Sequence, residues 1–241
     1  ILAKGKTPCD LLDLYGRTAL HWAAEQGHLL VTQVLINTGA NFETRCLQNR
    51  TPLMLAALGG HEEVVGMMLK AGAGVTKPCN KLPRSIFLWT STALHYAASG
   101  GHLSILLQCG AEADLRNHRG SSPLHIAACQ GSVAITTALL DAGADKEARM
   151  VNGRSPLYLA VINCNIDVVT LLLRSQAFTE HRDRRRGQTP LSEAAEYGLA
   201  PTIRILLEAG ADVESASSEG LTPLHWACRY NNSTSVEVLL A

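Results

Sequence analysis

The sequence predicts an all-α fold in which short helix pairs stack side by side into a solenoid. Two observations support this prediction. A Thr/Ser, Pro/Ala, Leu triplet recurs along the chain at intervals close to 33 residues, and a pair of small residues and then a pair of large apolar residues follow each triplet. A unit of this size cannot bury its own apolar face, so neighbouring units must cover one another.

Each triplet marks the start of a first helix. A hydroxyl side chain can accept hydrogen bonds from the free N–H groups of a helix start, and proline suits the next position because its missing donor would be unpaired there. The triplets begin at Thr18, Thr51, Thr92, Ser122, Ser155, Thr189 and Thr222.

The remaining positions predict a close-packed second helix and a turn. Small pairs such as Ala23 and Ala24 allow helices to approach closely, later pairs such as Leu35 and Ile36 supply the second helix, and glycines end the helices. We therefore expect one array over residues 1–241. Residues 1–15 would be the tail of an earlier repeat, and the last repeat would be truncated. The repeats are expected to start near residues 16, 49, 90, 120, 153, 187 and 220.

This pattern resembles the ankyrin-repeat family, whose repeats carry T-P-L-H-x-A-A and L-L-x-x-G-A-D at a period of 33. The best match is TPLHWAC, which begins at Thr222 and is preceded by LLEAGAD at residues 206–212. The resemblance implies a right-handed ankyrin-repeat solenoid with β-turn fingers that project at right angles. It also implies a concave face, made of fingers and first helices, that commonly holds protein partners.

Composition excludes several classes of protein. The chain has 21 basic and 21 acidic side chains, so no overall field favours nucleic acid or an anionic membrane. No apolar run is long enough to cross a bilayer, and we expect no membrane insertion. Seven scattered cysteines with no C-x-x-C pair suggest a reducing compartment. We expect an intracellular, cytoplasmic protein, with the nucleus as the alternative.

Histidines recur within the repeats and raise the question of metal or proton chemistry. Most of them occupy two consensus boxes, T-P-L-H and G-H: His21, His95, His125 and His225, then His28, His61 and His102. We favour a structural interpretation, in which the imidazoles bond backbone and hydroxyl groups of their own and the adjacent repeat. No catalytic motif is present, so we expect no enzyme, no metal site and no cofactor.

Aromatic residues on the first helices are one candidate partner-binding set. The position after the T-P-L-H histidine is apolar in nearly every repeat, and in three repeats it is aromatic: Trp22, Tyr96 and Trp226. Aromatic side chains are enriched at interfaces. The alternative is that these residues pack neighbouring helices, as apolar residues at helical spacing usually do.

An insertion between Gly72 and Thr92 supplies a second candidate. It extends one finger and contains Phe87, Leu88 and Trp89, which either anchor a partner or fold back over the neighbouring finger. Near residues 103–109 the second helix is about one turn short. Either the helix is shorter there or residues are absent from the sequence.

Arginines on three consecutive fingers are the third candidate: Arg116, Arg119, Arg149, Arg154, Arg182, Arg184, Arg185 and Arg186. Stacking would bring them to one edge, where forked guanidinium groups suit an acidic or phosphorylated partner. The alternative is a solvated surface whose charge is offset by Glu112, Asp114, Asp145, Glu147, Glu180 and Asp183.

Three functions follow from these features. The leading hypothesis is a non-enzymatic scaffold or adaptor that binds a protein segment on its concave face and fingers. The second is a cytoplasmic recognition or regulatory part of a larger channel, ubiquitin-ligase receptor or enzyme. The third, less expected, is nucleotide or oligonucleotide binding through the arginine-bearing fingers.

The fifth repeat departs from the consensus. Cys164 and Gln176 stand where other repeats have the glycines that end the first and second helices. If the left-handed backbone conformation is retained, each costs about 1 kcal/mol, and this repeat would be the least stable.

Overall fold

The computed structural model describes residues 8–74, 92–102, 105 and 113–241. The chain divides into two compact units, residues 1–118 and 119–241, and each is considered by itself. Every regular element within the described ranges is helical, which confirms the all-α prediction. The candidates Phe87, Leu88 and Trp89 lie outside the described residues, as does the short segment at 103–109 apart from Ile105.

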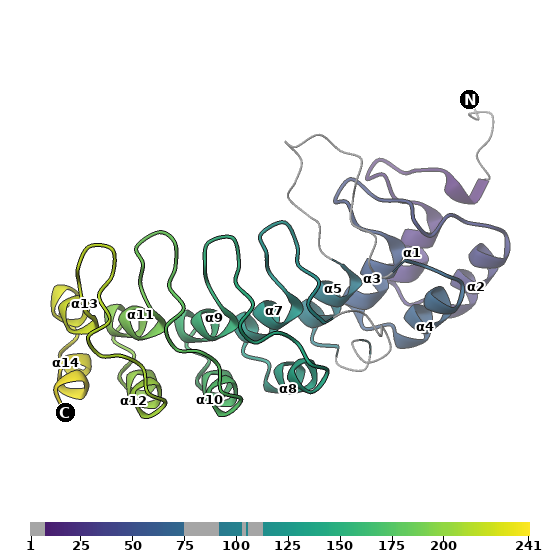
Figure 1. Ribbon diagram of the computed structural model, residues 1–241. Helices are drawn as coiled ribbons and strands as arrows, with labels where there is room; N and C mark the ends of the chain where they lie inside the picture. Colours follow the sequence, from purple (N-terminus) through teal and green to yellow (C-terminus); the bar gives the residue numbers. More distant parts are fainter. Residues whose placement is uncertain (1–7, 75–91, 103–104, 106–112) are drawn as a thin grey trace. The chain divides into compact units, whose positions relative to one another are not determined.

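Among its described residues, the first unit contains one 3-10 helix, η1, followed by two complete helix pairs and the first helix of a third pair (Figure 1). The bounds are η1 Pro8–Asp10, α1 Ala19–Glu25, α2 Leu29–Asn37, α3 Pro52–Gly59, α4 Glu62–Lys70 and α5 Ala93–Gly100.

The second unit contains four helix pairs. The bounds are α7 Pro123–Gln130, α8 Val133–Asp141, α9 Pro156–Ile162, α10 Ile166–Arg174, α11 Pro190–Glu196, α12 Ala200–Glu208, α13 Pro223–Arg229 and α14 Ser233–Leu240. Long loops join α8 to α9, α10 to α11 and α12 to α13, and they project to one side of the helices (Figure 1). We call these loops the fingers: residues 142–155, 175–189 and 209–222.

The predicted triplets begin the first helices. Thr51 directly precedes α3, and its hydroxyl accepts a hydrogen bond from the Met54 N–H at 3.3 Å. Pro52 occupies the first turn, where its missing donor leaves nothing unpaired. Ser155 caps α9 in the same way, from the Tyr158 N–H at 3.2 Å. The predicted capping is therefore confirmed at these helices.

The helices of each unit form two layers. First helices pack in sequence, α1 on α3 on α5 in the first unit and α7 on α9 on α11 on α13 in the second. Second helices form the other layer. Between the layers of the second unit lies a continuous core in which Ala194, Ala195 and Leu206 have no exposed surface. The small pairs thus allow the close approach that the sequence predicted.

The fifth repeat retains the left-handed backbone without glycine. Cys164 has φ of 57° and Gln176 has φ of 63°, close to the values of 74° and 81° at Gly131 and Gly143 in the preceding repeat. A side chain in this region clashes with its own backbone, so the predicted strain is present at both positions.

Candidate functional site

Two histidines of the T-P-L-H boxes, His21 and His125, join their helix starts to the next repeat. The Nδ1 atom of His21 accepts the Thr18 N–H at 3.1 Å, and its Nε2 lies 3.1 Å from the carbonyl oxygen of Arg50. In the second unit, Nε2 of His125 lies 3.2 Å from the carbonyl oxygen of Arg154. Burial lowers the pKa of His21, which keeps the ring neutral. These bonds confirm the structural interpretation.

Two of the three G-H histidines, His61 and His102, bond backward to the preceding repeat. Nε2 of His61 lies 2.8 Å from the Glu25 carbonyl oxygen, and Nε2 of His102 lies 3.1 Å from that of Leu58. A side chain at Gly27 would collide with His61, since an added Cβ would lie 2.4 Å from its Nδ1 atom. This box therefore needs both the glycine and the histidine.

Asparagines replace the G-H histidines in the second unit, a role that sequence reasoning missed. The Asn165 side chain donates to the Ala128 carbonyl oxygen at 2.8 Å, and the Asn232 side chain donates to that of Ala195 at 2.9 Å. A sequence signal existed, because each asparagine follows the residue that ends a first helix.

Backbone hydrogen bonds join the tips of neighbouring fingers, and of the equivalent loops in the described part of the first unit. In the second unit, N–H groups donate from Val151 to Arg119 at 2.9 Å, from Arg184 to Asn152 at 2.7 Å and from Ser218 to Arg186 at 2.9 Å. In the first unit, Leu47 donates to Tyr15 at 3.0 Å. Because these bonds use main-chain atoms alone, they fix the positions of the tips without restricting their side chains.

Carboxylates join the finger bases in a second ladder. Their oxygens accept backbone N–H groups of the next repeat: Asp10 from Asn41, Glu43 from Gly74, Glu147 from Phe178 and Glu180 from Asp212. Glu147 also contacts Nε2 of His181 at 2.9 Å. Two of the carboxylates that could have offset the finger arginines are therefore engaged by the backbone and by a histidine.

Two of the candidate arginines also hold the fingers together. Nε of Arg149 donates to the Gly153 carbonyl oxygen of its own finger, and Nη2 donates to that of Arg182 in the next one, both at 3.2 Å. Arg182 in turn donates to the Ser215 hydroxyl at 2.7 Å and to the Ala216 carbonyl oxygen. Both side chains are solvent-exposed but have a structural role.

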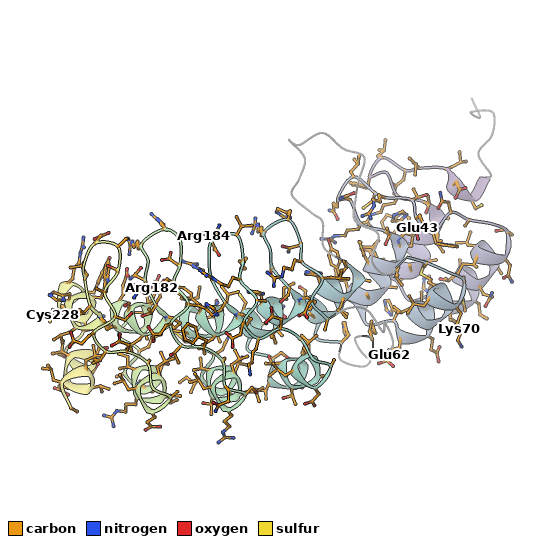
Figure 2. All side chains as sticks on the ribbon, viewed as in Figure 1. Glu43, Glu62, Lys70, Arg182, Arg184 and Cys228 are labelled. Atoms are coloured by element: carbon orange, nitrogen blue, oxygen red, sulfur yellow. The ribbon has the colours of Figure 1, made fainter. Side chains whose placement is uncertain are left out.

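Arg184 and Arg185 differ from these two. Both are exposed, and neither guanidinium group has a hydrogen-bond or ion-pair partner within the part of the chain that the structure describes. Figure 2 labels Arg184 on the finger between α10 and α11. Arg119 is also exposed in this unit, whereas Arg116 belongs to the first unit and is not placed relative to the others.

Arginines cover the aromatic residues of the first helices. The guanidinium carbon of Arg17 lies 4.6 Å from the ring centroid of Trp22, and that of Arg186 lies 5.4 Å from the ring centroid of Trp226. Trp22 is 43% exposed, but Tyr96 and Trp226 are 8% and 1% exposed. Burial favours the packing alternative for Tyr96 and Trp226, and Trp22 is the member of the set that reaches solvent.

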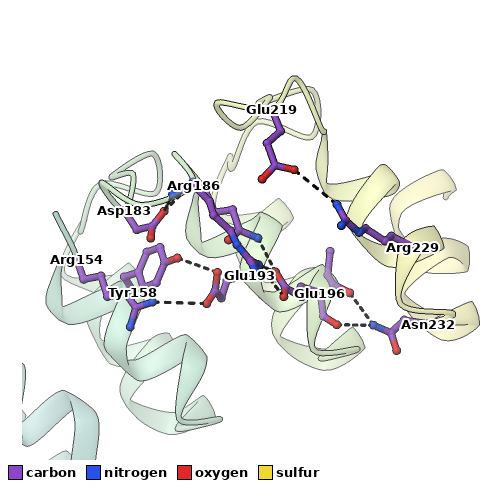
Figure 3. Close-up of polar contacts among 11 residues, drawn as sticks. Arg154, Tyr158, Asp183, Arg186, Glu193, Glu196, Glu219, Arg229 and Asn232 are labelled. Carbon is purple, nitrogen blue, oxygen red and sulfur yellow. Dashed lines mark hydrogen bonds and ion pairs between the residues drawn. The ribbon is translucent and has the colours of Figure 1, made fainter. Parts of the chain in front are cut away.

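A buried polar cluster joins α9 to α11, and sequence reasoning did not identify it (Figure 3). Tyr158 takes the position of the T-P-L-H histidine, and its hydroxyl donates to the Glu193 carboxylate at 2.8 Å. The Arg154 guanidinium lies 3.9 Å from the same carboxylate. Burial raises the pKa of Glu193, while Tyr158 and Arg154 oppose that rise. The cluster replaces the histidine bridge with a tyrosine and a carboxyl group.

Arg186 forms a second cluster, on the finger at residues 175–189. Its Nη1 lies 3.0 and 3.1 Å from the two carboxylate oxygens of Glu196, which also accepts from Gln188 at 2.7 Å. The hydrogen bond with Glu196 raises the pKa of Arg186. This guanidinium group is thus already paired.

The described residues contain no group of three or more His, Cys, Asp or Glu side chains arranged to hold a metal ion. None of their helices has the length and apolar character that crossing a bilayer requires.

Comparisons with known proteins agree with these features. The family described as "Ankyrin repeats (3 copies)" matches residues 1–81, 76–149, 94–183 and 176–241. The human ankyrin repeat and KH domain-containing protein 1 is 40% identical over 109 residues, which cover 44% of this chain and 4% of that protein. Crystal structures of the ankyrin repeat domains of human ASB11 and of Bcl-3 align with TM-scores of 0.78 and 0.79. Their sequence identities are 29% and 28%; the alignments cover 93% and 94% of this chain and 97% and 99% of those chains.

Two further relatives have informative names. A transient receptor potential cation channel subfamily A member 1 homolog of Caenorhabditis elegans is 32% identical over 118 residues. These residues cover 48% of this chain and 9% of that protein. The probable E3 ubiquitin-protein ligase XBOS33 of Oryza sativa is 40% identical over 82 residues, 34% of this chain and 14% of that protein. The chain thus spans a small part of the curated relatives it matches, and by its repeats, its helix pairs and these matches it belongs to the ankyrin-repeat family.

Proposed function

We propose that this chain is a non-enzymatic scaffold or adaptor module that binds a segment of another protein on its concave face and fingers. The observation that carries the proposal is the contrast between neighbouring arginines. Arg149 and Arg182 bond to carbonyl groups of the fingers, whereas the exposed guanidinium groups of Arg184 and Arg185 have no partner within the described ranges.

The chemistry of these two side chains favours an acidic or phosphorylated partner. A guanidinium group presents forked donors that match carboxylate and phosphate oxygens. Nearby carboxylates do not supply that match: Glu147 and Glu180 accept backbone N–H groups, and Asp183 is buried, where it accepts the N–H groups of Arg186 and Gln188.

Trp22 is the second element of the proposed surface. Its indole is exposed on α1, and Nε1 donates to the Asp13 carboxylate at 2.9 Å, which holds the ring in place. A fixed, exposed aromatic side chain can contact a partner at a small cost in conformational entropy. Trp22 lies in the first unit and the two arginines lie in the second, so the proposal makes them independent contacts.

The test compares two variants of equal charge. Arg184→Ala/Arg185→Ala removes the unpaired fingertip arginines, and Arg174→Ala/Arg204→Ala removes two exposed arginines from the ends and faces of α10 and α12. Fluorescence anisotropy would measure binding of a hexaglutamate peptide, a phosphoserine peptide, a neutral peptide and a short RNA. We expect the fingertip variant to weaken binding of the anionic peptides about three- to tenfold, and the control variant to leave it unchanged.

Each outcome decides between functions. If both variants weakened binding equally, overall charge alone would explain the attraction, and the proposal would be contradicted. Preferential, salt-dependent binding of the RNA, lost in the fingertip variant, would support the oligonucleotide alternative instead. A Trp22→Ala variant that binds every peptide as the parent does would remove Trp22 from the surface.

The relatives favour a second candidate, in which this surface serves a larger protein. A channel homolog and a probable ubiquitin ligase are among the proteins it resembles, and the chain spans only 9% and 14% of their lengths. The module would then be the recognition or regulatory part of such a channel, ligase receptor or enzyme. Sequencing the full transcript tests this second candidate, since an adjoining membrane or catalytic domain would support it.

We also propose an intracellular, cytoplasmic location, with the nucleus as the alternative. The described cysteines Cys9, Cys46, Cys129, Cys164 and Cys228 are all free thiols. Free thiols persist in reducing compartments. Imaging of a fluorescently tagged full-length protein tests the location.

A further inference from the structure

The fingertips of the second unit change charge along the row. Unpaired cations, Arg184 and Arg185, stand on the finger at 175–189. The next finger carries Glu219 at its tip and Glu214 at its base, and its residues 209–222 include no lysine or arginine. Cationic and anionic tips are therefore direct neighbours within one unit.

The acidic finger keeps one carboxylate at its tip within reach of a ligand. Asp212, nearer the base, is occupied, because its Oδ1 atom accepts the Glu214 N–H at 3.0 Å. Glu219 lies 3.6 Å from Arg229 in a pair whose side chains are 51% and 57% exposed (Figure 3). A pair this exposed contributes little, so Glu219 can exchange Arg229 for a ligand cation.

The spacing of the tips sets the spacing of the ligand. The Ser218 N–H donates to the Arg186 carbonyl oxygen at 2.9 Å, which fixes the acidic tip beside the basic one. Packed helices lie about 8–10 Å apart, and their fingers repeat at the same interval. An extended peptide advances about 3.3 Å per residue, so about three residues separate positions that face consecutive fingers.

We propose that the second unit selects an extended segment of two blocks, an acidic block over Arg184 and Arg185 and basic residues about three positions farther over Glu219. This inference rests on the proposed function and adds the order of charges to it. A uniformly acidic ligand would meet repulsion at the last finger, whereas a two-block ligand meets opposite charge at both.

Three peptides of equal length separate the inferences. The block peptide has six glutamates, two glycines and two lysines in that order. The interspersed peptide has the same composition with both lysines placed within the glutamate run. The acidic peptide replaces the lysines of the block peptide with glutamines. Anisotropy at low ionic strength would measure all three against the parent chain, Arg184→Ala/Arg185→Ala, and Glu219→Gln.

We expect the parent to bind the block peptide about threefold or more tighter than the interspersed one. Glu219→Gln should abolish that preference and should not weaken binding of the acidic peptide. This acid-to-amide change is at an exposed position, and an unchanged melting temperature would confirm that the fold is intact.

Two results would overturn the charge order. One is equal affinity of the parent for the block and interspersed peptides, and the other is a preference that survives in Glu219→Gln. If instead the proposed function is wrong, the acidic peptide would bind the parent and Arg184→Ala/Arg185→Ala equally well.

Discussion

Replacing Cys164 and Gln176 with glycine should stabilise the second unit. Both residues adopt left-handed backbone angles, φ of 57° and 63°. Both side chains are exposed, and neither has a hydrogen-bond partner within the described ranges. The native chain therefore carries backbone strain at two positions where these side chains contribute no compensating contact.

The size of the effect follows from two opposing terms. The left-handed region costs a residue with a side chain about 1–2 kcal/mol, whereas glycine loses about 0.5–1 kcal/mol more conformational entropy on folding than alanine. The net gain is about 0.5–1 kcal/mol at each site. The sites flank α10, a helix of nine residues, and lie more than 10 Å apart, so their gains should add to about 1–2 kcal/mol.

Urea and thermal unfolding followed by circular dichroism would measure the gain. We expect Cys164→Gly/Gln176→Gly to raise the melting temperature by roughly 3–6 °C. Cys164→Ala and Gln176→Ala are matched controls, because alanine keeps the backbone strain and removes the side chain. Gly143→Ala is the mirror control: its φ is 81° and nothing lies within 4 Å of an added Cβ, so it should lose about 1 kcal/mol.

The reasoning would be refuted if the alanine variants stabilised the chain as much as the glycine variants do. Stability would then depend on removing the cysteine and glutamine side chains rather than on backbone geometry. An unchanged melting temperature for Gly143→Ala would show that a side chain in the left-handed region costs no stability here, and would refute the strain argument.

Two further changes test the contacts between repeats. Because burial raises the pKa of Glu193, the folded state binds a proton at this carboxyl group more readily than the unfolded chain does. Proton binding therefore stabilises the fold at low pH, and this stabilisation is lost as pH rises through the folded-state pKa. The stability of Glu193→Gln relative to the parent should therefore increase from pH 4 to pH 7 in urea titrations, and a constant difference would contradict the assigned burial. Gly27→Ala should destabilise the first unit by about 2 kcal/mol or more, since its Cβ would meet His61 at 2.4 Å. Gly39→Ala, with open space around the added Cβ, should lose only about 1 kcal/mol, and equal losses would exclude the steric role of His61.

Local rules predicted most of the helical framework. The hydroxyl and proline of a triplet act within one helical turn, so Thr51 and Pro52 could be identified as a helix start from neighbouring residues alone. The same holds for Cys164 and Gln176, whose unusual backbone follows from their place in the repeat.

The buried contacts between repeats could not be predicted in this way. Tyr158 and Glu193 are 35 residues apart, and neither matches the consensus of its position, so only stacking reveals that they bond. Trp226 is similar: Arg186, on the finger of the preceding repeat at residues 175–189, lies over its ring and contributes to covering it. Whether an aromatic residue at this position is exposed depends on a long side chain in another repeat.

The division of the finger arginines has a physical basis in the fingertip ladder. Main-chain atoms join the tips, so the fold requires no particular side chain at Arg184 or Arg185. Placing these cations beside Arg182 and Arg186 costs electrostatic repulsion, which the fold does not offset with a carboxylate at either guanidinium group in the described chain. Arg182 and Arg186 offset their own share through the Ser215 hydroxyl and the Glu196 carboxylate. An anionic ligand at the tip would relieve the remaining repulsion, and binding there should strengthen as ionic strength falls.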